Sequence, residues 1–106
     1  MNGIKKPRPG AIRIPANAPL TKQSAEVMRV WVTHQAGSTV FIDAGLLADP
    51  HMFGHLIADT VRHAAKAYAG TNDMAEDAAL QRIVDGLGEE LREQFNSITP
   101  MQGSTN

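Results

Sequence analysis

Histidine and carboxylate side chains recur at four-residue intervals in one stretch, at His51, His55, Asp59 and His63. In a helix of 3.6 residues per turn, successive members lie on one side, about 40° apart. Adjacent pairs, such as His51 with His55, could chelate a metal such as zinc through imidazole and carboxylate ligands. Four residues in line do not surround one ion, and the sequence shows no second ligand cluster. We therefore expect no bound metal, and the alternative interpretation is the polar flank of an amphipathic helix.

Residues for nucleophilic catalysis are few. A serine nucleophile needs a neighbouring base, and the serines fall in predicted loops without a recognisable motif around them: Ser24, Ser38, Ser97 and Ser104. Glu89 and Glu90 belong to an acidic helical face, and no dinucleotide, P-loop, metalloprotease or EF-hand pattern is present. We expect neither an enzyme nor a cofactor.

The histidines lie in a predicted helix from Pro50 to Ala69. Asp49 is a typical N-cap, Pro50 suits the first helical position, and Gly70 should end the helix. Its apolar positions recur at spacings of three and four and form one stripe. They are Phe53, Leu56, Ile57, Thr60, Val61, Ala64, Ala67 and Tyr68.

A second helix should follow from Asp73, which caps it in the pattern Asp73-Met74-Ala75-Glu76, and should run to about Asn96. The short connection predicts antiparallel neighbours. Gly86 and Gly88 predict a kink or a close neighbour in this helix, and Gly54 predicts close approach of another backbone to the first helix.

The stretch from Met28 to Ala44 has the composition of a β-hairpin, because β-branched and aromatic residues flank His34-Gln35-Ala36-Gly37-Ser38. A three-residue loop, Gln35-Ala36-Gly37, would use Gly37 as its left-handed residue. The hairpin should run from about Val27 to Asp43.

This loop sets a register in which cross-strand pairs match in type. One face pairs Val32 with Val40, Val30 with Ile42 and Met28 with Ala44. The other pairs Thr33 with Thr39, Trp31 with Phe41 and Arg29 with Asp43. The stripe of the first helix should cover the valine face.

The aromatic face then needs a cover of its own, because burying Trp31 and Phe41 is worth about 3 to 6 kcal/mol. The second helix or an N-terminal edge strand with Ile12 and Ile14 could provide it. A symmetric dimer could also do so, either by stacking these faces or by pairing hairpin edges. We expect a homodimer with Arg29, Trp31 and Phe41 at the interface.

Charge is distributed unevenly along the chain. Residues 1–25 contain five Lys and Arg and no acid, whereas residues 26–106 contain five Lys and Arg and eleven acids. The basic segment also holds prolines at 7, 9, 15 and 19, which predict a flexible arm over residues 1–24. Nucleic-acid contact through this arm is an alternative that we do not favour.

The 106 residues, with 42% hydrophobic and 20% charged content, indicate a single soluble domain. We expect an α+β fold over residues 25–97, with the antiparallel β-hairpin packed against two antiparallel helices, and a disordered tail over residues 98–106. No apolar run could span a membrane and no signal peptide is evident, so we expect a cytoplasmic protein.

One further pattern combines several of these residues. Arg29-Val30-Trp31, the hairpin, Asp49-Pro50 and the run from Asp59 through Arg62-His63 to Ala67-Tyr68 resemble a family of small bacterial proteins classed as a domain of unknown function. The likeness covers about residues 25–95 and implies a hairpin followed by two helices. Phe53 stands where members often carry tryptophan.

The family has no activity to transfer, but the resemblance marks Asp59, Arg62 and His63 as a polar cluster. The leading hypothesis for function is a non-catalytic homodimeric interaction or adaptor module, with itself or an unidentified protein as partner. The alternatives are a small ligand or metal at the histidine and aspartate face of the first helix, and nucleic acid at the arm.

Overall fold

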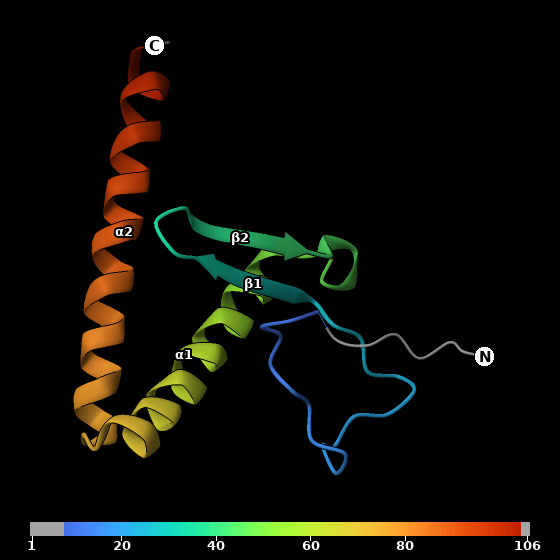
Figure 1. Cartoon of the computed structure of the whole chain (residues 1–106). Helices are drawn as coiled ribbons and strands as arrows, with labels where there is room; N and C mark the ends of the chain where they lie inside the picture. The colour runs from blue at the N-terminus through green and yellow to red at the C-terminus, as the bar shows by residue number, and fades with distance from the viewer. Residues whose placement is uncertain (1–7, 105–106) are drawn as a thin grey trace. The chain divides into compact units, whose positions relative to one another are not determined.

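The computed structural model describes the backbone of residues 8–104 and the side chains of residues 8–97. The order of elements is β1 (Met28–Thr33), β2 (Gly37–Ile42), a short 3-10 helix (Ala44–Leu46), α1 (Pro50–Asn72) and α2 (Glu76–Ser104) (Figure 1). Over residues 8–104 the fold is α+β, as predicted, with one antiparallel hairpin and two α-helices. The chain divides into two compact units, which meet at the Leu46–Leu47 bond and are described separately below.

The first unit contains the two-stranded sheet. β1 and β2 pair antiparallel, with Val30 opposite Val40 and Arg29 opposite Phe41. Because side chains alternate between faces along a strand, Arg29, Trp31 and Phe41 share one face, and Val30 and Val40 share the other. The predicted division of residues between the two faces is confirmed.

The predicted register is wrong by two residues. Trp31 lies opposite Thr39 instead of Phe41, and the strands begin to pair at Thr33 and Gly37. The turn is centred on Gln35, where φ is 63°, and the Ala36 amide donates to the Thr33 carbonyl over 2.9 Å. Gly37 is left-handed, with φ of 87°, but it belongs to β2 rather than to the loop. The loop keeps three residues but lies one residue earlier, at 34–36, so that its centre moves from Ala36 to Gln35.

The same shift changes two further pairs. Met28 lies opposite Ile42 instead of Ala44, and Val32 lies opposite Ser38 instead of Val40. A shift of two residues keeps every side chain on its own face, because the period along a strand is two.

In the second unit, α1 begins as predicted. Asp49 has extended backbone angles and its Oδ1 accepts the His51 amide over 3.0 Å, with Pro50 at the first position. The predicted end at Ala69 is wrong, because the helix continues through Gly70 to Asn72. Asp73 adopts the left-handed conformation that ends it, with φ of 53°, so an aspartate takes the position that we assigned to a glycine.

α2 begins at Glu76, and Asp73 is therefore the C-cap of α1 and not the N-cap of α2. The helix extends past the predicted end at Asn96 to Ser104 and includes most of the segment for which a disordered tail is predicted. Our prediction ended the helix with its apolar stripe, but lengthening an existing helix requires no new nucleation.

α1 and α2 are in contact and diverge from their connection (Figure 1). Ala65 of α1 and Ala79 of α2 are 1% and 2% exposed. Among residues 47–97 of the helical unit, the close neighbours predicted at the glycines are not found: a Cβ on Gly54 or Gly86 would meet nothing within 4 Å. Gly88 lies near only Arg92 of its own helix, and α2 is continuous across both glycines.

Residues 8–27, which include the described part of the arm (8–24), consist of turns and irregular backbone. The edge strand that we considered at Ile12 and Ile14 does not form there, and Ile12 is 92% exposed. The expectation that α1 covers the valine face of the hairpin concerns two separate units and stays a prediction, as does a single domain over residues 25–97.

Candidate interaction site on the hairpin

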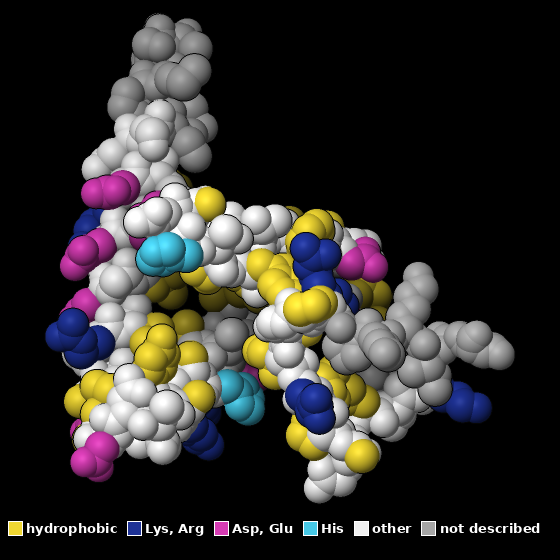
Figure 2. All heavy atoms as spheres, in the orientation of Figure 1, with side chains coloured by type: hydrophobic (Ala, Val, Ile, Leu, Met, Phe, Trp, Pro, Cys, Tyr) yellow, Lys and Arg dark blue, Asp and Glu magenta, His cyan; other side chains and the backbone are white. Residues whose placement is uncertain are grey.

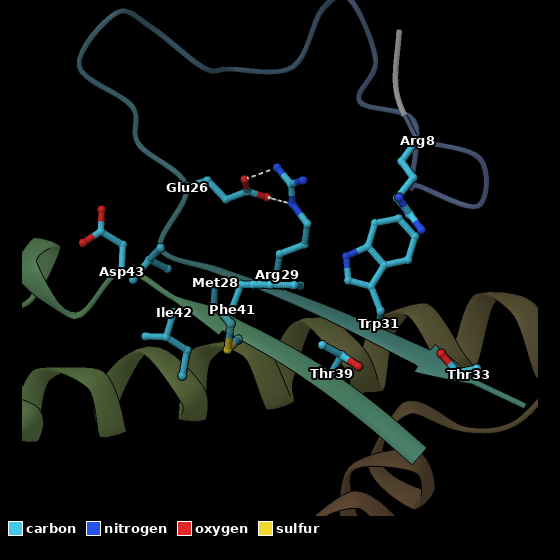
Figure 3. Close-up of a pocket in the computed structure, with 11 residues that line it drawn as sticks. Arg8, Glu26, Met28, Arg29, Trp31, Thr33, Thr39, Phe41, Ile42 and Asp43 are labelled. Carbon is cyan, nitrogen blue, oxygen red and sulfur yellow. Dashed lines mark hydrogen bonds and ion pairs between the residues drawn. The ribbon is translucent and has the colours of Figure 1, made fainter. Parts of the chain in front are cut away.

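An open groove of ≈ 690 Å³ lies in the first unit, along the face of the hairpin that carries Trp31 (Figure 3). Strand residues contribute an indole, a phenyl ring and two threonine hydroxyls to it. The lining residues are Arg8, Glu26, Val27, Met28, Arg29, Trp31, Thr33, Thr39, Phe41, Ile42 and Asp43. The volume falls in the range of small-molecule sites, but the groove is open to one side, as surfaces for partner chains are.

The arm partly covers the tryptophan. The Arg8 guanidinium carbon lies 5.9 Å from the centre of the Trp31 ring, within cation–π range. A Cβ on Gly10 would lie 3.6 Å from Cζ3 of the same ring, so the glycine backbone packs against the indole. The arm therefore contributes part of the cover that we predicted, through Arg8 and Gly10 instead of the isoleucines.

Arg29 pairs with a residue of the irregular segment that precedes β1. Its Nε donates to Glu26 Oε2 over 3.1 Å and its Nη2 donates to Oε1, which gives a bidentate pair (Figure 3). This hydrogen bonding, with the charge of the guanidinium, lowers the pKa of the Glu26 carboxyl. The predicted pairing with Asp43 is wrong, because the register places Phe41 opposite Arg29. Asp43 Oδ1 instead accepts the Gly45 amide over 3.2 Å.

Trp31 and Phe41 are diagonal neighbours on one face instead of direct partners. The Trp31 side chain is half-buried, whereas Phe41 remains 59% exposed. The three residues predicted for an interface, Arg29, Trp31 and Phe41, thus line one groove, and a large part of its aromatic surface faces solvent.

The polar cluster marked on α1 is only partly assembled. His63 Nε2 lies 3.5 Å from Asp59 Oδ2, and both side chains are well exposed, at 74% and 63%. Within residues 8–97, no hydrogen bond or ion pair joins Arg62 to either of them. An exposed pair of this kind contributes little to stability.

His51 and His55 do meet, as their spacing predicts. Their Nε2 atoms are 3.1 Å apart and the ring centres are 4.8 Å apart. Among the described residues no group of three or more histidine and acidic side chains could hold a metal ion. The pair provides two imidazoles and no third ligand.

Glu26 and the arm residues Arg8 and Gly10 are parts of the site that sequence reasoning missed. Glu26 gave no usable signal, because a spacing of three residues joins side chains on a helix, whereas side chains three apart on an extended strand point to opposite faces. Arg8 and Gly10 had no sequence signal beyond the basic character of the arm, because a contact between irregular backbone and a strand follows no periodic pattern.

Comparisons with known proteins add a family and a fold. The model of the family described as "Domain of unknown function (DUF5076)" matches residues 11–95. A comparison with curated proteins finds no match.

A solved structure, described as that of "a putative pyruvate dehydrogenase from the photosynthetic bacterium Rhodopseudomonas palustrus CGA009", is similar to this chain. The sequence identity is 32% and the TM-score 0.59, with 85% of this chain and 88% of that chain covered. Within the part of the chain that the structure describes, no helix has the length and apolar character needed to cross a bilayer.

Proposed function

We propose that this chain, which belongs to the DUF5076 family, is a non-catalytic protein that assembles with a second copy of itself through the apolar surface of its hairpin. A chain of this size ordinarily buries a set of large aliphatic and aromatic side chains in one core. Among the described side chains, the buried hydrophobic residues are Ala65 and Ala79 alone.

The observation that carries the proposal is the exposure of large hydrophobic side chains on both faces of the hairpin. Val30, Val40 and Ile42 are 51%, 48% and 50% exposed on one face, and Phe41 is 59% exposed on the other. A two-stranded sheet is at best marginally stable in water. The hairpin therefore needs more apolar cover than its own strands provide.

The helical unit shows the same feature. Large side chains along α2 follow one another at spacings of four, three and four and are exposed: Leu80, Val84, Leu87, Leu91 and, one turn further, Phe95. Figure 2 shows hydrophobic side chains at the surface of both units. Exposed apolar areas of this kind are typical of protein interfaces.

The test is sedimentation analysis of the purified full chain at micromolar concentration. We expect a dimer, and a monomer would contradict the proposal. The Trp31→Ala variant distinguishes the two ways of association. If the aromatic faces stack, this variant becomes monomeric, and if hairpin edges pair, it stays dimeric.

The alternative functions predict different experimental results. Nucleic-acid binding through the arm would weaken steeply with salt and disappear on removal of residues 1–24. The enzyme name printed for the similar structure belongs to that protein. Oxidation of pyruvate by the purified chain would contradict a non-catalytic role.

A further inference from the structure

We propose that the second copy binds at the outer edge of β2, antiparallel and with Val40 on the two-fold axis, so that two hairpins form one four-stranded sheet. This inference rests on the proposed self-association and specifies its surface and register.

The hydrogen bonds of the hairpin determine which backbone groups of β2 face outward. The Asp43 amide donates to the Val27 carbonyl over 2.9 Å, so these opposite residues form a hydrogen-bonded pair. Such pairs alternate with non-hydrogen-bonded pairs along an antiparallel ladder. Phe41 and Thr39 therefore direct their amides and carbonyls toward β1. The residues whose amides and carbonyls point away from β1 are Ser38, Val40 and Ile42.

The composition of the two edges favours β2. All six residues of β2 are exposed, and the strand contains no charged residue and no proline. β1 carries Arg29, which is paired with Glu26. Charged side chains and prolines are the usual protection of an edge against pairing. The edge of β2 has neither, and within residues 8–104 no backbone hydrogen bond outside the hairpin uses the outward amides and carbonyls of Ser38, Val40 and Ile42, so this edge can accept another strand.

Two-fold symmetry then selects a register. In an antiparallel pair of identical strands, hydrogen-bonded positions must meet hydrogen-bonded positions. Placing Val40 opposite Val40 of the second copy also places Ser38 opposite Ile42, so all three outward-facing residues are used. A two-fold axis at Thr39 or at Phe41 would bring only two of these three outward-facing residues into hydrogen-bonded pairs.

The same register extends both faces of the sheet. On one face the two Val40 side chains meet at the axis. On the other, Thr39 lies beside Phe41 of the second copy, where a phenyl ring can pack on a threonine methyl group. The exposed Phe41 ring is thus partly covered, and the two aromatic grooves become parts of one surface.

Proline substitution tests the edge with a matched control. Val40 and Val30 lie opposite each other at a non-hydrogen-bonded position of the hairpin, so proline at either removes only an outward amide. Val40→Pro removes two hydrogen bonds of the proposed dimer, one from each copy, and should raise the dissociation constant at least about fivefold. Val30→Pro imposes the same strain on the hairpin and should leave the dimer intact. Equal effects of the two variants would overturn the proposal.

Cysteine cross-linking tests the register without relying on stability. The natural chain contains no cysteine, so a single introduced cysteine can form a disulfide only with a second copy. In the proposed register the two Val40 Cα atoms are about 5.5 Å apart, within the span of a disulfide. Val40→Cys should therefore cross-link rapidly under mild oxidation, and Val30→Cys should not.

The other outcomes are equally informative. If Thr39→Cys or Phe41→Cys cross-links faster than Val40→Cys, the two-fold axis lies elsewhere and this register is wrong. If Val30→Cys cross-links, the second copy binds at the edge of β1 and the choice of edge is wrong. In both cases a wild-type dimer would leave the proposed function standing. A wild-type monomer in the sedimentation experiment would overturn both proposals together.

Discussion

Glu26 and Arg29 form an ion pair whose carboxyl has a lowered pKa. Arg29 lowers the pKa of Glu26 in the folded chain, so the pair contributes stability above the pKa of the unfolded carboxyl, and that contribution is lost as the pH falls through the folded pKa. We expect the small stability difference between wild type and Glu26→Gln to shrink on acidification and in high salt. Carboxyl titration by NMR checks the cause: Arg29→Gln should move the Glu26 pKa upward. An unchanged pKa would show that the pair does not form in solution.

The two imidazoles of His51 and His55 can be tested for zinc binding. Their Nε2 atoms are 3.1 Å apart, and no third ligand converges on them among the described side chains. Because protein zinc sites use three or four side-chain ligands, we expect equimolar zinc to leave the melting temperature unchanged. Calorimetric titration of wild type and of the His51→Ala, His55→Ala double variant measures any binding. A heat of binding that disappears in the double variant would establish a metal site instead.

At the scale of elements, the N-cap of α1 was predictable because a short-range contact makes it. Asp49 accepts the His51 amide, and Asp49→Ala should lower the free energy of unfolding by about 1 kcal/mol. Asp73→Gly is the contrasting change at the other end of the helix, where φ is positive. Glycine suits that angle but adds freedom to the unfolded chain, so we expect a change within about 0.5 kcal/mol. Urea unfolding followed by circular dichroism measures both, and equal losses would contradict this account of the two ends.

The register of the hairpin shows where such local reasoning stops. Alternation of side chains in Met28–Thr33 and Gly37–Ile42 was sufficient to assign each residue to a face. Pair types were not sufficient to fix the register, because a shift of two residues exchanges one reasonable set of pairs for another. The register is set by the turn, in which Gln35 has a left-handed backbone conformation. Glutamine gives no strong sequence signal for that conformation. The contact of Arg8 with Trp31 was unpredictable for a similar reason, since it joins irregular backbone to a strand.

At the scale of the whole molecule, the exposed side chains link folding to association. If large hydrophobic groups such as Phe41 and Leu91 are covered only in a dimer, the stability of the chain depends on its concentration. Each tenfold increase in concentration is worth about 1.4 kcal/mol for each dimer, and we expect the melting temperature to rise by about 3 to 5 °C. Scanning calorimetry or circular dichroism over a hundredfold range of concentration measures this slope. Val40→Pro, which weakens the proposed edge, should melt at a lower temperature than Val30→Pro at every concentration, because less of it is dimeric. A wild-type melting temperature that does not change with concentration would mean that a single chain provides its own cover.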